Sequence, residues 1–190
     1  MDDGESQSSD SDSYTVDSPD ADTKNRTVFL IGEITEQSAA QVVAKLVTLA
    51  QVDSKPIRFV INTYGGCVDE SLAIYDTMKL LRAPVHTVGI GKVMSAGVLL
   101  LAAGEKGHRI IGARSRVMIH NGWGGFVGDS FEMKSEMAEF ERLMELEHQC
   151  LISETKLTKK QLERILNSRL DHYITPQQAI VYGIADKLTA

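Results

Sequence analysis

The segment GKVMSAGVLLLAAG, residues 91–104, places one hydroxyl group in an otherwise apolar run. Ser95 lies where a strand-like stretch gives way to a helix-like one. A serine there can be a small residue of the core, or a nucleophile held at a turn beside the free N–H groups of the following helix. The usual G-x-S-x-G elbow is incomplete, because Gly97 is present but Val93 occupies the position of the first glycine. The motif alone leaves both interpretations open.

A nucleophilic serine needs a base within hydrogen-bond reach and a group that orients this base. The chain has five histidines. His120 ends the segment SRVMIH just before a glycine-rich loop, at a strand edge where side chains reach a cleft, although a histidine at such a place is often structural. The orienting carboxylate is less well defined, because many acids are candidates and spacing alone does not select Asp171.

Strand-like and helix-like segments alternate through the body of the chain, which predicts an α/β fold with a mostly parallel sheet covered by helices. Strands are expected over residues 27–34, 57–62 and 85–91 and in HRIIGA and SRVMIH. Helices are expected over residues 38–51 with Ser38 as a candidate N-cap, over residues 70–82, directly after Ser95, in TKKQLERIL, and between Thr175 and Tyr182.

The character of the sequence changes after His120. The loop NGWGGFVG holds four glycines in eight residues, and a long helix is expected to follow it. Apolar residues recur near helical spacing along this helix, namely Met133, Met137, Phe140, Met144 and Leu151. Such a stripe is usually core contact, but a methionine-rich helix that projects from the body is also a candidate subunit interface.

Composition limits the class of protein. The 190 residues are enough for one domain with a substantial core, and 43% hydrophobic and 24% charged residues are ordinary for a soluble globular protein. No apolar run has the length of a membrane span, so we expect no membrane partner. Cys67 and Cys150 are the two cysteines, which argues against a disulfide framework and fits a reducing, cytoplasmic compartment. No Cys/His cluster has the spacing of a metal site.

The charge of the chain is concentrated at its N-terminus. Residues 1–24 hold eight acidic residues and one lysine, a charge of −7 against a total of −6, so the remainder sums to +1. We expect residues 1–26 to be a disordered acidic tail that acts as a solubilising leader, a removable propeptide or an interaction segment. Residues 27–190 should form a single domain. A near-neutral body without a basic stripe argues against nucleic acid as a partner.

Six segments together resemble the proteolytic subunit of the caseinolytic Clp protease (ClpP), a serine peptidase of family S14. They are FLIGEI, INTYGG, YDTM, MSAGVLLLAAG, SRVMIH and PQQAIVYGIADKL, and the similarity runs in order from about Val28 to Leu188. The serine segment and the RVMIH segment are the specific parts, and the spacing of 25 residues from Ser95 to His120 fits the family. The resemblance implies a crotonase-like α/β spiral of βαβ units with a protruding handle strand and helix.

The resemblance also implies catalytic roles. Ser95 corresponds to the nucleophile, His120 to the general base, and Asp171 to the acid that orients the histidine. The N–H groups of Gly66 and Ala96 correspond to the oxyanion hole. The implied activity is that of a serine endopeptidase, which hydrolyses unfolded polypeptide through an acyl-enzyme.

Substrate contacts and assembly follow from the same resemblance. Gly65, Gly124 and Gly125 match substrate-binding positions, and the last two lie on the handle strand, where an extended polypeptide would pair by strand addition. The family forms homo-oligomers, with heptameric rings stacked as a tetradecamer around a chamber. An AAA+ unfoldase, which binds ATP, is the implied partner. The chain itself has no P-loop, and we expect it to bind no cofactor and no metal.

This sequence departs from the family's pattern at several positions. The acidic tail leads almost directly into NRTVFLIG, where the family usually has a short helix and an axial loop. Arg58 and Val60 stand where aromatic docking residues are usual, and Tyr64 replaces a proline before the double glycine. Leu170 replaces an arginine that helps to pair the rings, with Arg169 one position earlier. The departures indicate a divergent member and put its unfoldase docking and ring pairing in question.

The sequence leaves four alternatives open. A crotonase-like acyl-CoA enzyme shares the fold but would not need the set Ser95, His120 and Asp171. A phage-type capsid-maturation protease on the same fold would explain a missing docking surface and a self-processed tail. A relative of signal peptide peptidases would use a Ser–Lys pair, for which Lys92 is close in sequence. A non-catalytic ring subunit would typically have lost a triad residue, and none is lost here.

Overall fold

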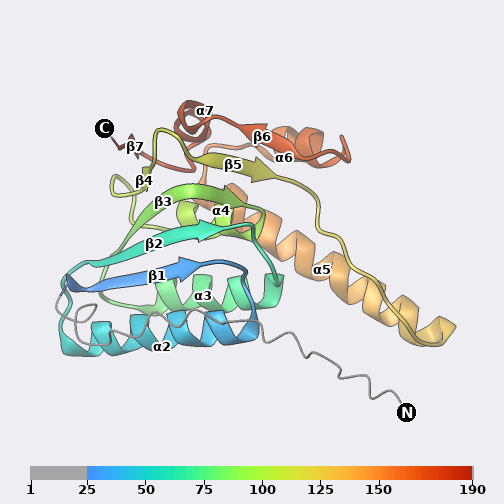
Figure 1. Cartoon of the computed structure of the whole chain (residues 1–190). Coiled ribbons are helices and arrows are strands. Elements are labelled where there is room, and N and C mark those ends of the chain that lie inside the picture. The colour runs from blue at the N-terminus through green and yellow to red at the C-terminus, as the bar shows by residue number, and fades with distance from the viewer. Residues whose placement is uncertain (1–24, 190) are drawn as a thin grey trace, which may run out of the picture.

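The computed structural model describes residues 25–189 (Figure 1), in which helices cover a single sheet. The strands are β1 (Thr27–Ile31), β2 (Ile57–Thr63), β3 (Val85–Met94), β4 (Ile110–Ile111), β5 (Arg116–Ile119), β6 (His172–Ile174) and β7 (Lys187–Leu188). The helices are α2 (Glu36–Val52), α3 (Val68–Leu80), α4 (Ala96–Ala102), α5 (Ser130–Glu154), α6 (Lys159–Leu166) and α7 (Pro176–Val181).

The sheet is mostly parallel, as the alternation of the sequence predicts. The strands follow the order β1-β2-β3-β4-β7, and all of these pairs are parallel. The long strand β3 changes partner along its length, because Val88 and Gly89 pair with β4 whereas residues 92–94 pair with β5. Strand β6 is antiparallel to β5 and was not expected from the sequence. Its three residues are too few to display a clear alternation.

The core lies between the sheet and the helices α2 to α4. All seven residues of α4 are buried, because this helix packs against β2, β3, α3 and α5. A fully apolar helix is expected where no face of it meets solvent. None of the helices in the described part of the chain is long and apolar enough to span a membrane.

The start of α2 differs from the prediction. Thr35, and not Ser38, is the N-cap, and its hydroxyl accepts from the Ser38 N–H at 3.3 Å. Ser38 is the third helical residue, and its hydroxyl accepts from the Thr35 N–H at 2.9 Å. The two residues form a reciprocal capping box, which saturates two N–H groups instead of one. The helix therefore begins at Glu36.

Helix α5 projects beyond the sheet, and the segment that follows β5 runs out alongside it (Figure 1). The Met-rich stripe is divided between two environments. Met144 and Leu151 are buried at the base of the helix, whereas Met133 and Met137 are exposed on its projecting half. Core contact is thus the right interpretation for the base of the helix.

The handle strand that the resemblance implies is not a strand in this structure. Residues 121–128 pair with no described strand, and a β-strand requires a partner ladder. The segment is held instead through its side chains, since Phe126 meets Phe140 of α5 edge to face at 5.9 Å between ring centroids.

Arg26, the last residue of the predicted tail, contacts the domain. Arg26, assigned to the tail, is tied to the body, because its guanidinium donates to the carbonyl oxygens of Leu49 at 2.9 Å and Lys55 at 2.8 Å and pairs with Asp53 at 3.0 Å. The predictions made for residues 1–24 lie outside the described residues.

Candidate active site

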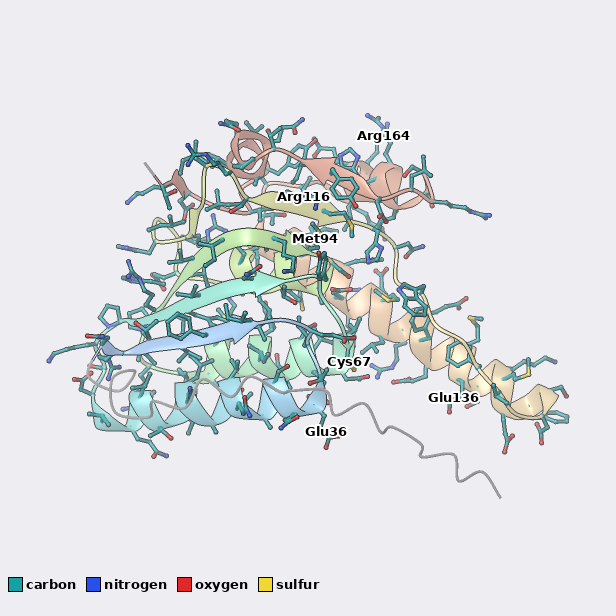
Figure 2. All side chains as sticks on the ribbon, in the orientation of Figure 1. Glu36, Cys67, Met94, Arg116, Glu136 and Arg164 are labelled. Carbon is teal, nitrogen blue, oxygen red and sulfur yellow. The ribbon has the colours of Figure 1, made fainter. Side chains whose placement is uncertain are left out.

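Three strand ends meet where the candidate triad lies. In the parallel ladder of β3 and β5, Met94 is paired with Met118, and the Ser95 N–H donates to the Met118 carbonyl at 2.9 Å. Figure 2 labels Met94 and Arg116 on these neighbouring strands. In the antiparallel ladder of β5 and β6, Ile119 is paired with His172. The backbone register thus brings together the residues that follow β3, follow β5 and precede β6.

The side chains of these three residues form a connected chain. The Nε2 atom of His120 lies 2.9 Å from the Oγ atom of Ser95, and its Nδ1 atom lies 3.4 Å from Oδ1 of Asp171. The hydroxyl of Tyr173 lies 3.4 Å from the other carboxylate oxygen of Asp171. The His120 side chain is 23% exposed and that of Asp171 is 50% exposed, so the base is sheltered more than its orienting acid. Sequence reasoning did not identify the contact of Tyr173.

The backbone of Ser95 is in a strained conformation. Its φ of 54° and ψ of −131° fall in a region that non-glycine residues rarely adopt. Its side chain does not cap α4, and it is only partly buried. The interpretation of Ser95 as a small core residue is therefore wrong. A turn of this kind presents the hydroxyl at the surface of the sheet edge, towards His120.

The double glycine is required by close packing against the serine turn and against Ile34, which follows β1. A Cβ atom on Gly65 would lie 2.6 Å from the Cβ of Ser95, and one on Gly66 would lie 2.2 Å from the carbonyl oxygen of Ile34. Both glycines also have positive φ values, 104° and 149°. A side chain at either position would displace the loop that faces Ser95.

The two glycines differ in the N–H groups that they leave free. The Gly65 N–H donates to the Thr63 hydroxyl at 2.9 Å, so Gly65 lines the site without offering a donor. Within residues 25–189, the Gly66 N–H makes no hydrogen bond with the protein. The N–H of Ala96 belongs to the first residue of α4, where N–H groups lack an intrahelical acceptor. The donors predicted for the oxyanion hole are therefore free to receive an acceptor.

A pocket of about 440 Å³ opens beside Ser95 and His120. Its lining includes Gly65 and Gly66, and helices α4, α5 and α6 supply an apolar wall. Two acidic residues also line it, Glu33 near the end of β1 and Glu147 on α5. Glu147 was missed by sequence reasoning. The only signal for it was a polar residue at the place where the apolar stripe of α5 skips from Met144 to Leu151.

The glycine-rich loop borders the same pocket through Gly122 and Trp123. Gly124 and Gly125, predicted to bind substrate, lie further along and are exposed. Within the described residues, the backbone groups of residues 122–127 make no hydrogen bonds. This loop therefore carries unpaired donors and acceptors, which an extended chain can use.

The other candidate bases lie in different settings. The ammonium group of Lys92 lies over the Tyr64 ring, 4.4 Å from its centroid, and does not contact Ser95. His86 and His108 stack on each other at 4.0 Å and line a separate pocket. His148 lines the active-site pocket from α5, where burial lowers its pKa. In residues 25–189, no group of three His, Cys, Asp or Glu side chains is arranged to hold a metal ion.

The comparison with protein families agrees with the fold. The Clp protease family model matches residues 10–190, which is nearly the whole chain. The chain belongs to the Clp protease family. The mixed α/β architecture with a parallel sheet is that of this family, and membership makes the chain a peptidase of ClpP type. The roles of individual residues, including Ser95, His120 and Asp171, stay predictions that rest on the geometry above.

Proposed function

We propose that this Clp protease family member is a serine endopeptidase that hydrolyses unfolded polypeptides through the triad Ser95, His120 and Asp171. The observation that carries the proposal is the connected geometry, with 2.9 Å from Nε2 of His120 to Oγ of Ser95 and 3.4 Å from Nδ1 to Asp171. A hydrogen bond from nucleophile to base, with a carboxylate on the far side of the base, is the signature of an activated serine.

The reaction is an acyl transfer. His120 takes the proton of Ser95 at Nε2 while the oxygen attacks a peptide carbonyl carbon. Asp171 faces Nδ1, which keeps the proton there and stabilises the imidazolium as it forms. His120 then protonates the leaving amine, and water hydrolyses the acyl-enzyme through the same base. The bonds that change need no cofactor.

The developing oxyanion would be received by the N–H groups of Gly66 and Ala96. Neither N–H group donates a hydrogen bond within the described chain. Removing one oxyanion-hole donor typically lowers kcat by about 10²–10³-fold. Substrate backbone would pair with the loop that holds Gly124 and Gly125, whose unpaired groups are suited to strand addition. Recognition through backbone groups favours extended, unfolded chains.

We further propose that the active form is an assembly of two stacked heptameric rings. The support is the projecting half of α5, on which Phe131, Met133 and Met137 are exposed without a partner in the described chain. Leu170, at the position of the ring-pairing arginine, is also exposed. An AAA+ unfoldase remains the proposed partner, but Arg58 is exposed and Val60 is buried, so the usual aromatic docking groups are replaced.

Degradation of an unfolded polypeptide tests the activity. The full chain should cleave β-casein, and Ser95→Ala should reduce the rate by at least about 10³-fold. Ser130→Ala, at the exposed start of α5, is the matched control and should leave the rate unchanged. A transient mass increase on Ser95 would mark the acyl-enzyme. A crotonase-like acyl-CoA enzyme would cleave no casein, and light scattering on the same sample tests for fourteen subunits.

A further inference from the structure

The pocket wall on α5 contains one carboxylate in an otherwise apolar position. Phe140, Met144, Glu147 and Leu151 recur at helical spacing and all line the pocket beside Ser95. On the N-terminal half of α5, side chains of this stripe are exposed to solvent. Near the C-terminal end of the helix, the same stripe lines the pocket. Glu147 is therefore placed where the periodicity of the helix calls for an apolar side chain.

The contrast with Glu154 shows that the fold pairs its other inward carboxylate on α5. Glu154 is buried, and it is held by Lys79 at 2.5 Å, Lys106 at 2.9 Å and the Tyr75 hydroxyl at 3.0 Å. Glu147 lies two turns earlier on the same helix. Within residues 25–189 its side chain has no hydrogen bond and no ion pair. Glu147 is half-buried, so its carboxylate loses part of its hydration without gaining a partner in the described chain.

The described residues around Glu147 offer no positive charge. Among them, no lysine or arginine lines the pocket, and the second carboxylate that lines it is Glu33. Burial lowers the pKa of the neighbouring His148, which keeps that ring neutral near pH 7. Burial also raises the pKa of Glu147 to about 7, as expected for a carboxyl group without a cation. A cation that entered the pocket would find an unpaired partner there.

We propose that Glu147 makes the pocket beside Ser95 select a cationic side chain, that of the lysine or arginine whose carbonyl is attacked. The ammonium or guanidinium group would pair with the carboxylate, and the aliphatic stem would lie along Met144 and Leu151. The pocket volume of about 440 Å³ accommodates one such side chain. This selectivity rests on the proposed peptidase function, which it narrows to substrates rich in basic residues.

Fluorogenic peptides that differ only in the residue before the scissile bond test the proposal. Arginine, lysine, glutamine and leucine are compared at this position by kcat/KM, normalised to the fraction of protein that a fluorophosphonate labels. Arginine and lysine peptides should be preferred. Glu147→Gln should lower their kcat/KM by about 10–100-fold and change the leucine peptide by less than about threefold. Glu141→Gln, exposed on the same helix, should change neither.

Reversing the charge tests the proposal independently. Glu147→Lys should create a preference for glutamate over arginine at the residue before the scissile bond. A preference for glutamine or leucine in the wild-type protein, or an arginine-to-leucine ratio that Glu147→Gln leaves unchanged, overturns the proposal. These outcomes presuppose a preparation that cleaves at least one peptide. A folded, assembled preparation that cleaves none and takes no label contradicts the peptidase function, and this inference with it.

Discussion

The two sides of the active-site pocket are held in place by different means. On one side, Ser95, His120 and Asp171 adjoin the ends of β3, β5 and β6, so backbone ladders set their positions. On the other side, α5 presents side chains at helical spacing. A slip of one residue in a ladder would turn every side chain to the opposite face, whereas one helix position can change alone. The ladders thus hold the proposed catalytic residues, whereas single side chains of α5 would set the proposed choice of substrate.

Loss of the orienting carboxylate is the largest change that leaves the nucleophile and base in place. Asp171→Asn should lower kcat by about 10³–10⁴-fold, because an amide neither fixes the His120 tautomer nor stabilises the imidazolium. Steady-state kinetics on the peptide with leucine before the scissile bond measure this loss of kcat. Tyr173→Phe is the control, since it removes only a hydroxyl 3.4 Å from Asp171, and it should stay within about threefold of the wild type. An Asp171→Asn variant within tenfold of the wild type would show that the sheet edge does not act as a triad.

The glycine loop opposite the serine turn should be nearly as sensitive. Gly66→Ala adds a Cβ atom 2.2 Å from the Ile34 carbonyl oxygen at a φ of 149°, so the loop must move and carry its N–H away from the oxyanion position. We expect kcat to fall by about 10²–10³-fold. Gly107→Ala also adds a Cβ at a positive φ, 87°, but it meets nothing within 4 Å and lies away from the pocket, so it should keep its kcat. Equal rates for the two alanine variants would contradict the role of the Gly66 N–H.

The smallest expected effect is on the free energy of unfolding, and it concerns Glu147 on α5. Burial raises the pKa of Glu147 from 4.5 to about 7, so the folded state holds a proton that the unfolded state has lost between these values. Wild-type stability should fall as pH rises through this window, and Glu147→Gln should remove the loss. We expect the variant to be more stable by about 1–2 kcal/mol above pH 7, discounted for partial exposure, and equal at pH 4.5.

Urea unfolding of both proteins at pH 4.5 and pH 8 measures this difference. Asp171→Asn is the comparison variant, because its half-exposed carboxyl contacts His120 without lining the pocket, and it should not show the stability gain of Glu147→Gln. Among the described residues, the other titratable groups that line the pocket are Glu33, Tyr64, His120 and His148, and they are common to all of these proteins. An equal stability gain at both pH values would mean that the charge of Glu147 is not its cause.

Much of the fold follows from local sequence. Neighbouring residues in the chain determine the alternation of strands and helices, the turn at Ser95 and the position of His120 at a strand end. The structure confirms all three. The capping of α2 was misassigned by three residues, because Thr35 and Ser38 are both good caps and only their reciprocal bonding distinguishes them. Strand β6 has only three residues, and its extended conformation depends on pairing with β5, which is distant in the sequence.

The site was less accessible to sequence reasoning than the fold. Asp171 was chosen by family resemblance, since its place beside His120 depends on an antiparallel register between distant segments. Glu147 has the appearance of an ordinary solvated helix charge, and only the packing of α4 and α6 against the base of α5 makes it part of a pocket. Gly65 lines the pocket, and its predicted contact with substrate stays a prediction that does not involve its N–H, which donates to Thr63.

Covalent labelling of the assembled full chain tests the central claim most directly. The protein is treated with a fluorophosphonate probe beside Ser95→Ala and Ser130→Ala, and the modified peptide is mapped by mass spectrometry. We predict one adduct, on Ser95, in the wild type and in Ser130→Ala, and no adduct in Ser95→Ala. An adduct on another residue, or an unlabelled wild type that is folded and assembled, would contradict a Ser95 nucleophile activated by His120.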